Sequence, residues 1–427
     1  MTEAFVQSLP LLDSGDVVIA GAGPAGLCAA VAAARQGARV ILLERFGAVG
    51  GSLTVGHVRT CMGEIAAGTM QEEIGRLLDT GGACIPHDVE RAKYVLSQWL
   101  EDNGVILYLQ TPVAEVWKAG ENVRGLVVST PRGLARVAGR TTVDATGDGT
   151  AAALAGAPYQ MGRPSDGLVQ PASLLFTIDR VHSDLVCTHE ADDTMLDGVS
   201  YLQLCEQASR CGELPPDVTI VRLYGGQAPD ERLVNANQLC RVDGTSPADI
   251  ARADRMLRGQ IQQVVDFLRK RVKGFENCRL TGSAEAPGFR ETRRIQGDYT
   301  LTASDISAGR TFPDVVVHHA NFCFDTHNPA GGGQAEDLEA ARDTRPYDIP
   351  YRCLLPRGVE NLLVAGRCLS GTHKAHSSYR VMNICMAVGE AAGIAAALSA
   401  ASRISPRKLP AAAVQEKLQK NGVSLFG

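Results

Sequence analysis

The chain has 427 residues, of which 45% are hydrophobic and 5% aromatic, and its formal net charge at pH 7 is −5. This length predicts two domains or one large domain with an insertion, and the composition is typical of a soluble globular protein with an aliphatic core. The sequence has neither a basic block nor a long acidic tail, which argues against a nucleic-acid partner.

Cysteine usage and the N-terminal residues predict a cytoplasmic location. The twelve cysteines are scattered and form no C-x-x-C pair, so reduced thiols are favoured over a disulfide framework or a zinc site. The first basic residue is Arg35, which argues against a secretory signal peptide. Residues 17–34 are apolar enough to imitate a membrane span, but their glycines and proline favour a nucleotide-binding turn, so we expect no membrane partner.

A glycine-rich turn follows the first predicted strand. Residues 17–20 are apolar and β-branched, as in a buried parallel strand. The G-x-G-x-x-G pattern that follows consists of Gly21, Gly23 and Gly26. Alanine-rich sequence then predicts a helix as far as residue 36, and residues 40–43 predict a second strand.

This turn has the features of a dinucleotide-binding site. Gly21 permits a tight turn, Gly23 lets the backbone approach a pyrophosphate, and Gly26 lets helix and strand pack closely. The phosphates would lie at the positive N-terminal end of the helix. Glu44, at the end of the second strand, can accept hydrogen bonds from a ribose diol.

The rest of the chain predicts one interrupted domain. The pattern predicts helices over residues 70–78, 88–101, 247–272 and 381–401, and strands over residues 105–109, 113–117, 123–129, 135–137, 142–145, 315–317 and 362–365. The strands from residue 113 to 137 read as a β-meander, and the strand that follows ends in DATGDG. Nucleotide-binding character returns after residue 346, so we expect the middle third to be an insertion.

The sequence resembles the FAD-dependent oxidoreductases of the glutathione-reductase-like class, and within it the broad FAD dependent oxidoreductase family. The resemblance rests on GAGPAG with its acid, the Gly50-Gly51 loop, DATGDG, NLLVAGR, and residues 288–302, 327–333 and 347–382. It implies an α/β fold, with a Rossmann-like FAD-binding domain that carries the β-meander (residues 1–155 and 346–427) and an inserted α+β substrate or cap domain (residues 156–345).

The resemblance also implies which residues contact FAD. These are Gly21, Gly23, Pro24, Ala25 and Gly26 with Gly51 and Ser52 at the pyrophosphate, Glu44 and Arg45 at the ribose, Val113 at adenine, Ala145, Gly147 and Asp148 along the dinucleotide, Gly366 and Arg367 near the ribityl chain, and the helix start from Val381 to Asn383 at the ring. Many relatives place an acid where Arg367 stands. Non-covalent FAD is the default, and attachment through His57 or Cys61 stays open.

Substrate-side candidates lie in the middle and late chain. Arg290, Arg293 and Arg294 are close together, and guanidinium groups suit a substrate carboxylate or the flavin carbonyls, with surface ion pairing as the alternative. His318 and His319 follow a strand, and because neighbouring strand residues point to opposite faces, we expect at most one to reach the site.

His327 precedes the glycine run at residues 331–333 and could accept a proton. We take Arg293, His319 and His327 as the catalytic candidates. His373 and His376 stand three residues apart, but no matching ligand set accompanies them and we expect no metal. Arg380, just before the last long helix, is suited to stabilise a reduced flavin.

The function that follows is hydride transfer between FAD and a small polar organic substrate, by alcohol or amine oxidation or by reduction of an activated alkene. A redox-neutral isomerase or hydratase that uses FAD is the alternative, and a non-catalytic FAD-binding protein is a third hypothesis. The sequence has no C-x-x-C pair, which argues against a disulfide reductase. It also has no G-D-x-x-H motif at Gly366, which argues against an aromatic hydroxylase. The sequence does not identify the electron acceptor, and a homo-oligomer is compatible with it.

Overall fold

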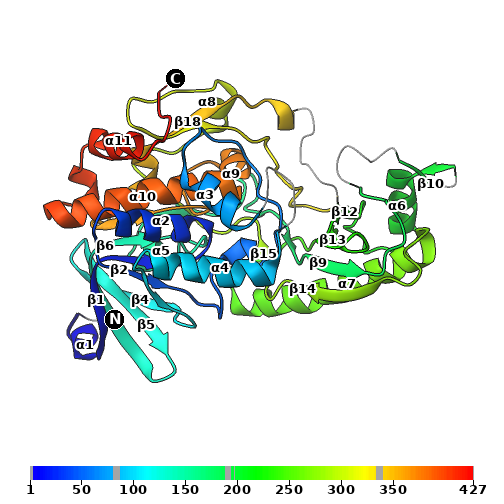
Figure 1. Cartoon of the computed structure of the whole chain (residues 1–427), viewed down its shortest axis with the longest axis horizontal. Helices are drawn as coiled ribbons and strands as arrows, with labels where there is room; N and C mark the ends of the chain where they lie inside the picture. Colours follow the sequence, from blue (N-terminus) through cyan, green and yellow to red (C-terminus); the bar gives the residue numbers. More distant parts are fainter. Residues whose placement is uncertain (1–2, 80–86, 188–193, 197, 333–339, 427) are drawn as a thin grey trace.

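The computed structural model describes residues 3–79, 87–187, 194–196, 198–332 and 340–426 (Figure 1). Its main sheet has seven strands in the order β3-β2-β1-β6-β5-β4, with β19 also paired to β6. The strands are β1 Leu11–Ala20, β2 Val40–Leu43, β3 Ile106–Tyr108, β4 Val113–Ala119, β5 Asn122–Thr130, β6 Gly133–Asp144 and β19 Leu362–Val364. Strands β3, β2, β1, β6 and β19 run parallel, and β4 and β5 are antiparallel.

Strand β6 joins the meander to the parallel part of the sheet. Its first half pairs antiparallel with β5, its last three residues pair parallel with β19, and its opposite edge pairs with β1. The prediction of two separate strands at residues 135–137 and 142–145 was therefore wrong. The residues between them stay extended because they pair with β1, which is itself longer than predicted: Gly15 of β1 pairs with Gly139 of β6.

Two long helices pack face to face over this sheet. Helix α2 (Pro24–Arg35) and helix α10 (Met382–Ser402) approach closely because α10 carries glycine at the contact (Figure 1). A Cβ at Gly389 would lie 2.0 Å from the carbonyl oxygen of Ala25, and one at Gly393 would lie 2.1 Å from that of Ala29. The N-terminal turn and the late helix therefore form one packed unit.

Helix α10 is also the one described helix that is long and apolar enough to cross a membrane by length and composition. In this structure 89% of the most apolar stretch of α10 is buried inside the protein, as expected for the core helix of a globular domain. The remaining helices are α1 Glu3–Ser8, α3 Met70–Leu77, α4 Val89–Asp102, α5 Thr150–Leu154, α6 Tyr201–Arg210, α7 Pro247–Arg271, α8 Ala303–Ser307, α9 His373–Tyr379 and α11 Ala411–Lys420.

The middle of the chain has a second apolar core around an antiparallel sheet, at the right of Figure 1. This sheet has the order β12-β13-β9-β14, formed by Arg222–Gly225, Arg232–Asn235, Phe176–Asp179 and Arg279–Ser283. Helices α6 and α7 contribute Leu204 and Leu257 to the same core. The sequence predicted α7, whose N-cap Ser246 accepts the Asp249 N–H, but neither α6 nor this sheet.

The packing of residues 295–324 bears on the predicted domain boundary, which stays a prediction. Ile295, Phe312, Val317 and Phe324 belong to the first core rather than the second, although the insertion was predicted to reach residue 345. The smaller strands are β7 Tyr159–Gln160, β8 Ala172–Ser173, β10 Met195–Leu196, β11 Val199–Ser200, β15 Gly288–Phe289, β16 Arg294–Ile295, β17 Val315–Ala320 and β18 Tyr347–Pro350.

Candidate active site

A cavity of about 510 Å³ lies at the carboxyl ends of the parallel strands. Its lining includes the residues that follow four of them: Gly21 after β1, Glu44 after β2, Ala145 after β6 and Ala365 after β19. Open α/β sheets bind their ligands at this edge, because loops and helix N-termini gather there.

The glycine turn shapes one wall of the cavity. Gly21 has φ +93°, and a Cβ on Gly26 would lie 1.8 Å from the Gly21 carbonyl oxygen, so side chains are excluded at both positions. Gly23 has an ordinary φ of −75° and nothing within 4 Å of its would-be Cβ. Since Gly23 lines the cavity and no side chain caps α2, open space and free N–H groups meet there, as a pyrophosphate requires.

A second glycine pair supports this turn. Gly50 donates its N–H to the Ala22 carbonyl at 2.8 Å, and Gly51 adopts a φ of +52°. A Cβ on Gly51 would lie 2.9 Å from the Gly23 Cα. Ser52 also lines the cavity, but His57 and Cys61 are not among the lining residues. Burial raises the pKa of Cys61 to about 12, so this thiol is protonated at neutral pH.

Glu44 is a buried carboxylate at the end of β2. Its Oε2 accepts the Ala22 N–H at 2.7 Å and its Oε1 accepts the Phe46 N–H at 2.9 Å. Burial raises the pKa of the Glu44 carboxyl above its ordinary value, although these backbone donors oppose that shift. Each oxygen keeps further acceptor capacity toward the cavity, which fits the diol of a ribose.

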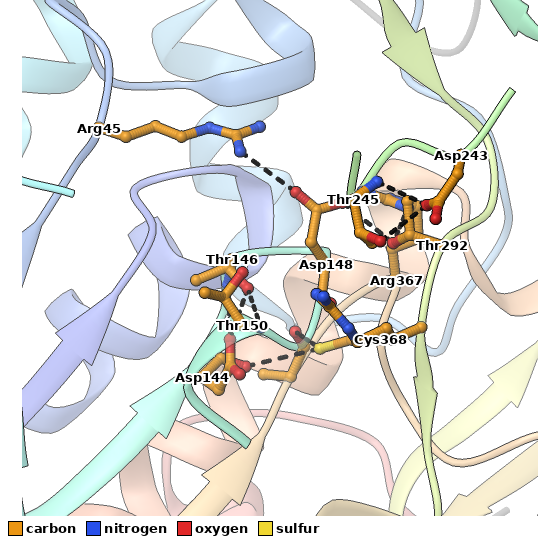
Figure 2. Close-up of polar contacts among 12 residues, drawn as sticks. Arg45, Asp144, Thr146, Asp148, Thr150, Asp243, Thr245, Thr292, Arg367 and Cys368 are labelled. Carbon is orange, nitrogen blue, oxygen red and sulfur yellow. Dashed lines mark hydrogen bonds and ion pairs between the residues drawn. The ribbon is translucent and has the colours of Figure 1, made fainter. Parts of the chain in front are cut away.

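Asp148 links two arginines across the cavity wall (Figure 2). Its Oδ2 lies 3.3 Å from Arg45 Nη1, its Oδ1 pairs with Arg367, and Thr292 donates to Oδ1 at 3.0 Å. Burial raises the pKa of Asp148, but Arg367 and then Arg45 outweigh burial and hold it below the ordinary value. Two cations against one anion leave a positive wall beside the glycine turn, which suits the phosphates of FAD.

The start of α10 forms another wall. Met382 and Cys385, three residues apart and hence on one helix face, line the cavity together with Arg380. Val381 and Asn383 were predicted to face the flavin ring, but neither residue lines the cavity. Asn383 Nδ2 instead donates to the Gly63 carbonyl at 2.8 Å. Burial raises the pKa of Cys385 to about 12, so this thiol is neutral.

The predicted cofactor residues are thus mostly brought together. All of them line the cavity except Gly26, Val381 and Asn383, and Gly26 acts by letting α2 approach β1. Their individual contacts with FAD stay predictions. The residues fit FAD, because the side-chain-free cradle, the buried acid after β2 and the positive wall occur around one cavity.

A polar cluster lies next to Arg380. We call it the Arg290 cluster, and it consists of Gln170, Arg290, Asp325, His327 and Arg380. Arg380 Nη2 donates to the Asp325 carbonyl and to Asp325 Oδ2, both at 2.8 Å. Asp325 Oδ1 lies 3.3 Å from His327 Nε2 of the imidazole ring. The backbone N–H of His327 donates to Gln170 Oε1 at 3.3 Å.

Charge perturbs two members of this cluster. Burial, with Arg290 beside it, lowers the pKa of His327 to about 4, so the imidazole is neutral at pH 7. Burial raises the pKa of Asp325, but His327, Arg380 and Arg290 outweigh it and hold the carboxyl well below its ordinary value. A neutral histidine and an ionised carboxylate therefore stand beside the cavity wall.

None of the three catalytic candidates lines the cavity, and His327 is connected to it through Asp325 and Arg380. Arg293 donates from Nη1 to the Asp148 carbonyl at 3.2 Å, and its guanidinium lies 5.4 Å from the Tyr159 ring centre. His319 is exposed, has φ +53°, and stacks on His318 with ring centres 4.1 Å apart. The catalytic roles of Arg293 and His319 stay predictions.

One local expectation for this region was wrong, and the alternative of surface ion pairing does not hold for Arg294. His318 and His319 do not point to opposite faces, because the left-handed φ of His319 breaks the alternation of β17. Arg294 does not pair at the surface: it is 2% exposed and pairs with the fully buried Glu291, which also contacts His373 Nδ1 at 2.9 Å. In the glycine run after His327, Gly333 lies outside the described residues.

Sequence reasoning missed several lining residues, among them Val55, Gly56, Thr111, Pro112, Gly244, Ile250, Ala286, Pro287, Gly288, Phe289 and Cys385. Residues 286–289 come from the middle of the chain and close over a cavity built by the first sheet. Their glycine and proline content signals a turn, but no local pattern connects that turn to the nucleotide-binding residues. The three-residue spacing from Met382, which lies in the predicted helix start, could have identified Cys385.

Known structures of similar fold are distant. A geranylgeranyl bacteriochlorophyll reductase-like protein from Thermoplasma acidophilum is 12% identical, with a TM-score of 0.49 over 96% of this chain and 84% of that chain. The anhydrotetracycline hydroxylase OxyS from Streptomyces rimosus is 13% identical, with a TM-score of 0.48 over 96% and 66%. Likeness at this level says nothing about the reaction, and no curated protein matches the sequence.

The family comparison is decisive for the class of protein. The sequence model of the family described as FAD dependent oxidoreductase matches residues 16–418, which include the glycine turn, the β-meander, the middle region and α10. The chain therefore belongs to the FAD dependent oxidoreductase family, and it is an enzyme that uses FAD in oxidation and reduction.

Proposed function

We propose that this enzyme transfers a hydride between FAD and a small polar organic substrate at the α10 wall of the cavity. The observation that carries the proposal is the chain of contacts from Arg380, which lines the cavity, through Asp325 to His327. FAD, when bound, supplies the hydride acceptor or donor. The residues then have to hold the substrate and move the accompanying proton.

His327 is the proton acceptor in this proposal. Its Nε2 faces Asp325 Oδ1 at 3.3 Å, a contact that favours the proton on Nε2 and leaves the Nδ1 lone pair free. Nδ1 is buried and has no hydrogen-bond partner among the described residues. A neutral imidazole held in this tautomer can take a proton from an alcohol or amine as hydride leaves the adjacent carbon. Asp325 would stabilise the imidazolium that forms.

Arg380 has a separate role beside the ring. It precedes α10, whose first turn has Val381 at the N-cap and no side-chain cap. A guanidinium and a helix N-terminus on one wall stabilise negative charge that develops there when the flavin is reduced. Asp325 fixes the direction of the guanidinium through the two 2.8 Å contacts from Nη2.

Anaerobic titration of the purified holoenzyme tests the proposal. A substrate alcohol or amine should bleach the oxidised-flavin absorbance, or an enoate should reoxidise the reduced enzyme. Product formation without bleaching would instead support the redox-neutral alternative. Failure of all three substrate classes to change the spectrum would overturn hydride transfer. A cytoplasmic location and a homo-oligomer stay predictions from the sequence, and the electron acceptor is not identified.

A further inference from the structure

The Arg290 cluster carries more positive than negative charge. Arg290 and Arg380 are two cations, Asp325 is one anion, and His327 is neutral at pH 7, which leaves a net charge of +2 − 1 = +1. Burial and the neighbouring Arg380 lower the pKa of Arg290 to about 10, which still leaves it charged. Both arginines are partly buried, and a cation that is withdrawn from water without a full counter-charge is costly, so an anionic ligand would be stabilised here.

Hydrogen-bond donors are also in excess. Among the described residues, Arg290 has one hydrogen bond, from Nη1 to the Pro171 carbonyl at 2.9 Å. Arg380 Nε and Gln170 Nε2 are buried and have no partner there, and Gln170 is only 1% exposed. Buried polar atoms in folded proteins almost always have partners, so these donors indicate a ligand rich in acceptors.

We propose that the Arg290 cluster binds the carboxylate of an organic-acid substrate. Arg290 is the principal cation, and Arg380 and Gln170 supply further donors. The inference rests on the proposed function, because it identifies the class of substrate for the same site. A bound carboxylate brings the net charge of the cluster to zero. Its oxygens can also accept hydrogen bonds from the donors, such as Arg380 Nε and Gln170 Nε2, that have no partner among the described residues.

This placement also orients the substrate. Arg380 lines the cavity, and Asp325 connects it to His327. A carboxylate held between Arg290 and Arg380 would therefore direct the carbon next to it toward the α10 wall and its own hydroxyl or amine toward His327. Neutral compounds of the same shape would lose the charge-assisted hydrogen bonds and bind weakly.

Binding can be measured without turnover. The holoenzyme is titrated with sodium acetate, lactate and succinate, with acetamide, lactamide and sodium chloride as uncharged and ionic-strength controls, and the flavin difference spectrum is recorded. We expect saturable spectra for the carboxylates only. Arg290→Gln should weaken carboxylate binding about tenfold or more, because a charge-assisted partner is lost, whereas Asp325→Asn should strengthen it by removing the competing anion.

Two further variants separate binding from folding. Arg290→Lys keeps the charge but not the planar fork, and should bind carboxylates more weakly than wild type and more tightly than Arg290→Gln. Arg279→Gln removes an arginine that pairs with Asp179 and is 55% exposed, and should leave binding unchanged. FAD content and melting temperature of each variant report on folding.

The outcomes distinguish this inference from the proposed function. No saturable carboxylate spectrum, or equal affinity in Arg290→Gln and wild type, overturns the carboxylate site even if neutral alcohols reduce the enzyme. Saturable carboxylate binding that depends on Arg290 supports the site even if no acid bleaches the flavin, a result that would count against hydride transfer alone. Binding of chloride as tight as that of succinate would also overturn a site for organic acids.

Discussion

The nucleotide-binding wall of the cavity and the Arg290 cluster, of which Arg380 lines the cavity, are built on different principles. The wall at β1 and α2 comes from consecutive residues, and its function depends on backbone N–H groups and on space that side chains leave open. The Arg290 cluster gathers Gln170, Arg290, Asp325, His327 and Arg380 from distant parts of the chain, and its function depends on side-chain charge. Substitutions in the nucleotide-binding wall should therefore act through packing and cofactor affinity, and substitutions in the Arg290 cluster through proton transfer and substrate charge.

The largest effect should come from Gly26→Ala. The new Cβ would lie 1.8 Å from the Gly21 carbonyl oxygen, and because this atom belongs to the backbone, α2 must move away from β1. We expect a loss of more than about 3 kcal/mol in the free energy of unfolding, at the upper end of overpacking effects. Thermal and urea denaturation of the apoprotein measure it, and a wild-type melting temperature would contradict the packing role of Gly26.

Glu390 should make the stability of the protein depend on pH. It is 2% exposed on α10, and Oε2 accepts the Met70 N–H at 2.9 Å. Burial raises its pKa to about 7, above the ordinary value of about 4.5 expected in the unfolded chain. The folded state then binds more protons between these values, so the stability that Glu390 contributes is lost as the pH rises through 7.

The variant Glu390→Gln removes this dependence. Relative to wild type, it should gain up to about 3 kcal/mol of stability between pH 4.5 and pH 8, at about 1.4 kcal/mol per pKa unit. Glu73→Gln is the matched control with opposite sign, because the hydrogen bond from Arg35 lowers the pKa of Glu73. Parallel pH trends for the two variants in thermal denaturation would refute the assignment.

In the Arg290 cluster, His327→Gln should slow flavin reduction without unfolding the protein. Loss of a positioned proton acceptor lowers rates by about 100-fold or more, whereas the melting temperature should change little. Stopped-flow absorbance under anaerobic conditions measures the rate, and an exposed residue, His182→Gln, serves as control. A variant that reduces flavin at the wild-type rate would remove His327 from the mechanism.

The rate of flavin reduction in the wild-type enzyme should stay at its high-pH value down to about pH 5. Burial lowers the pKa of His327 to about 4, so the imidazole stays neutral and able to accept a proton well below the ordinary histidine pKa of about 6.5. An apparent pKa near 6.5 in the reduction rate would show that His327 is not the titrating group or that bound substrate changes its surroundings.

The smallest effect should come from Gly23→Ala. With φ −75° and nothing within 4 Å of the new Cβ, the apoprotein should melt as wild type does. The methyl group would enter the cavity and weaken FAD binding about tenfold, a difference of about 1.4 kcal/mol. Quenching of FAD fluorescence measures the affinity, and Gly259→Ala in α7, which also meets nothing within 4 Å, should leave it unchanged. Unaltered affinity in Gly23→Ala would show that the phosphates lie elsewhere.

The amino-acid sequence alone determined the nucleotide-binding wall of this protein. Gly21, Gly23, Gly26 and Glu44 lie within 24 residues, and each acts through local backbone geometry, so spacing and residue type suffice to predict their arrangement. The late strand β19 and helix α10 could be placed for the same reason. Strand β19 ends one residue earlier than predicted, and helix α10 begins and ends one residue later than predicted.

Only the tertiary structure decided the rest. Strand β6 became continuous because β1 pairs along its length, and the ring of His319 stacks on His318 because one left-handed residue broke the strand alternation. The charge excess of the Arg290 cluster exists only where segments separated by up to 210 residues meet. Burial and neighbouring charge set the state of His327 and Asp325, and no local pattern in the chain encodes either quantity.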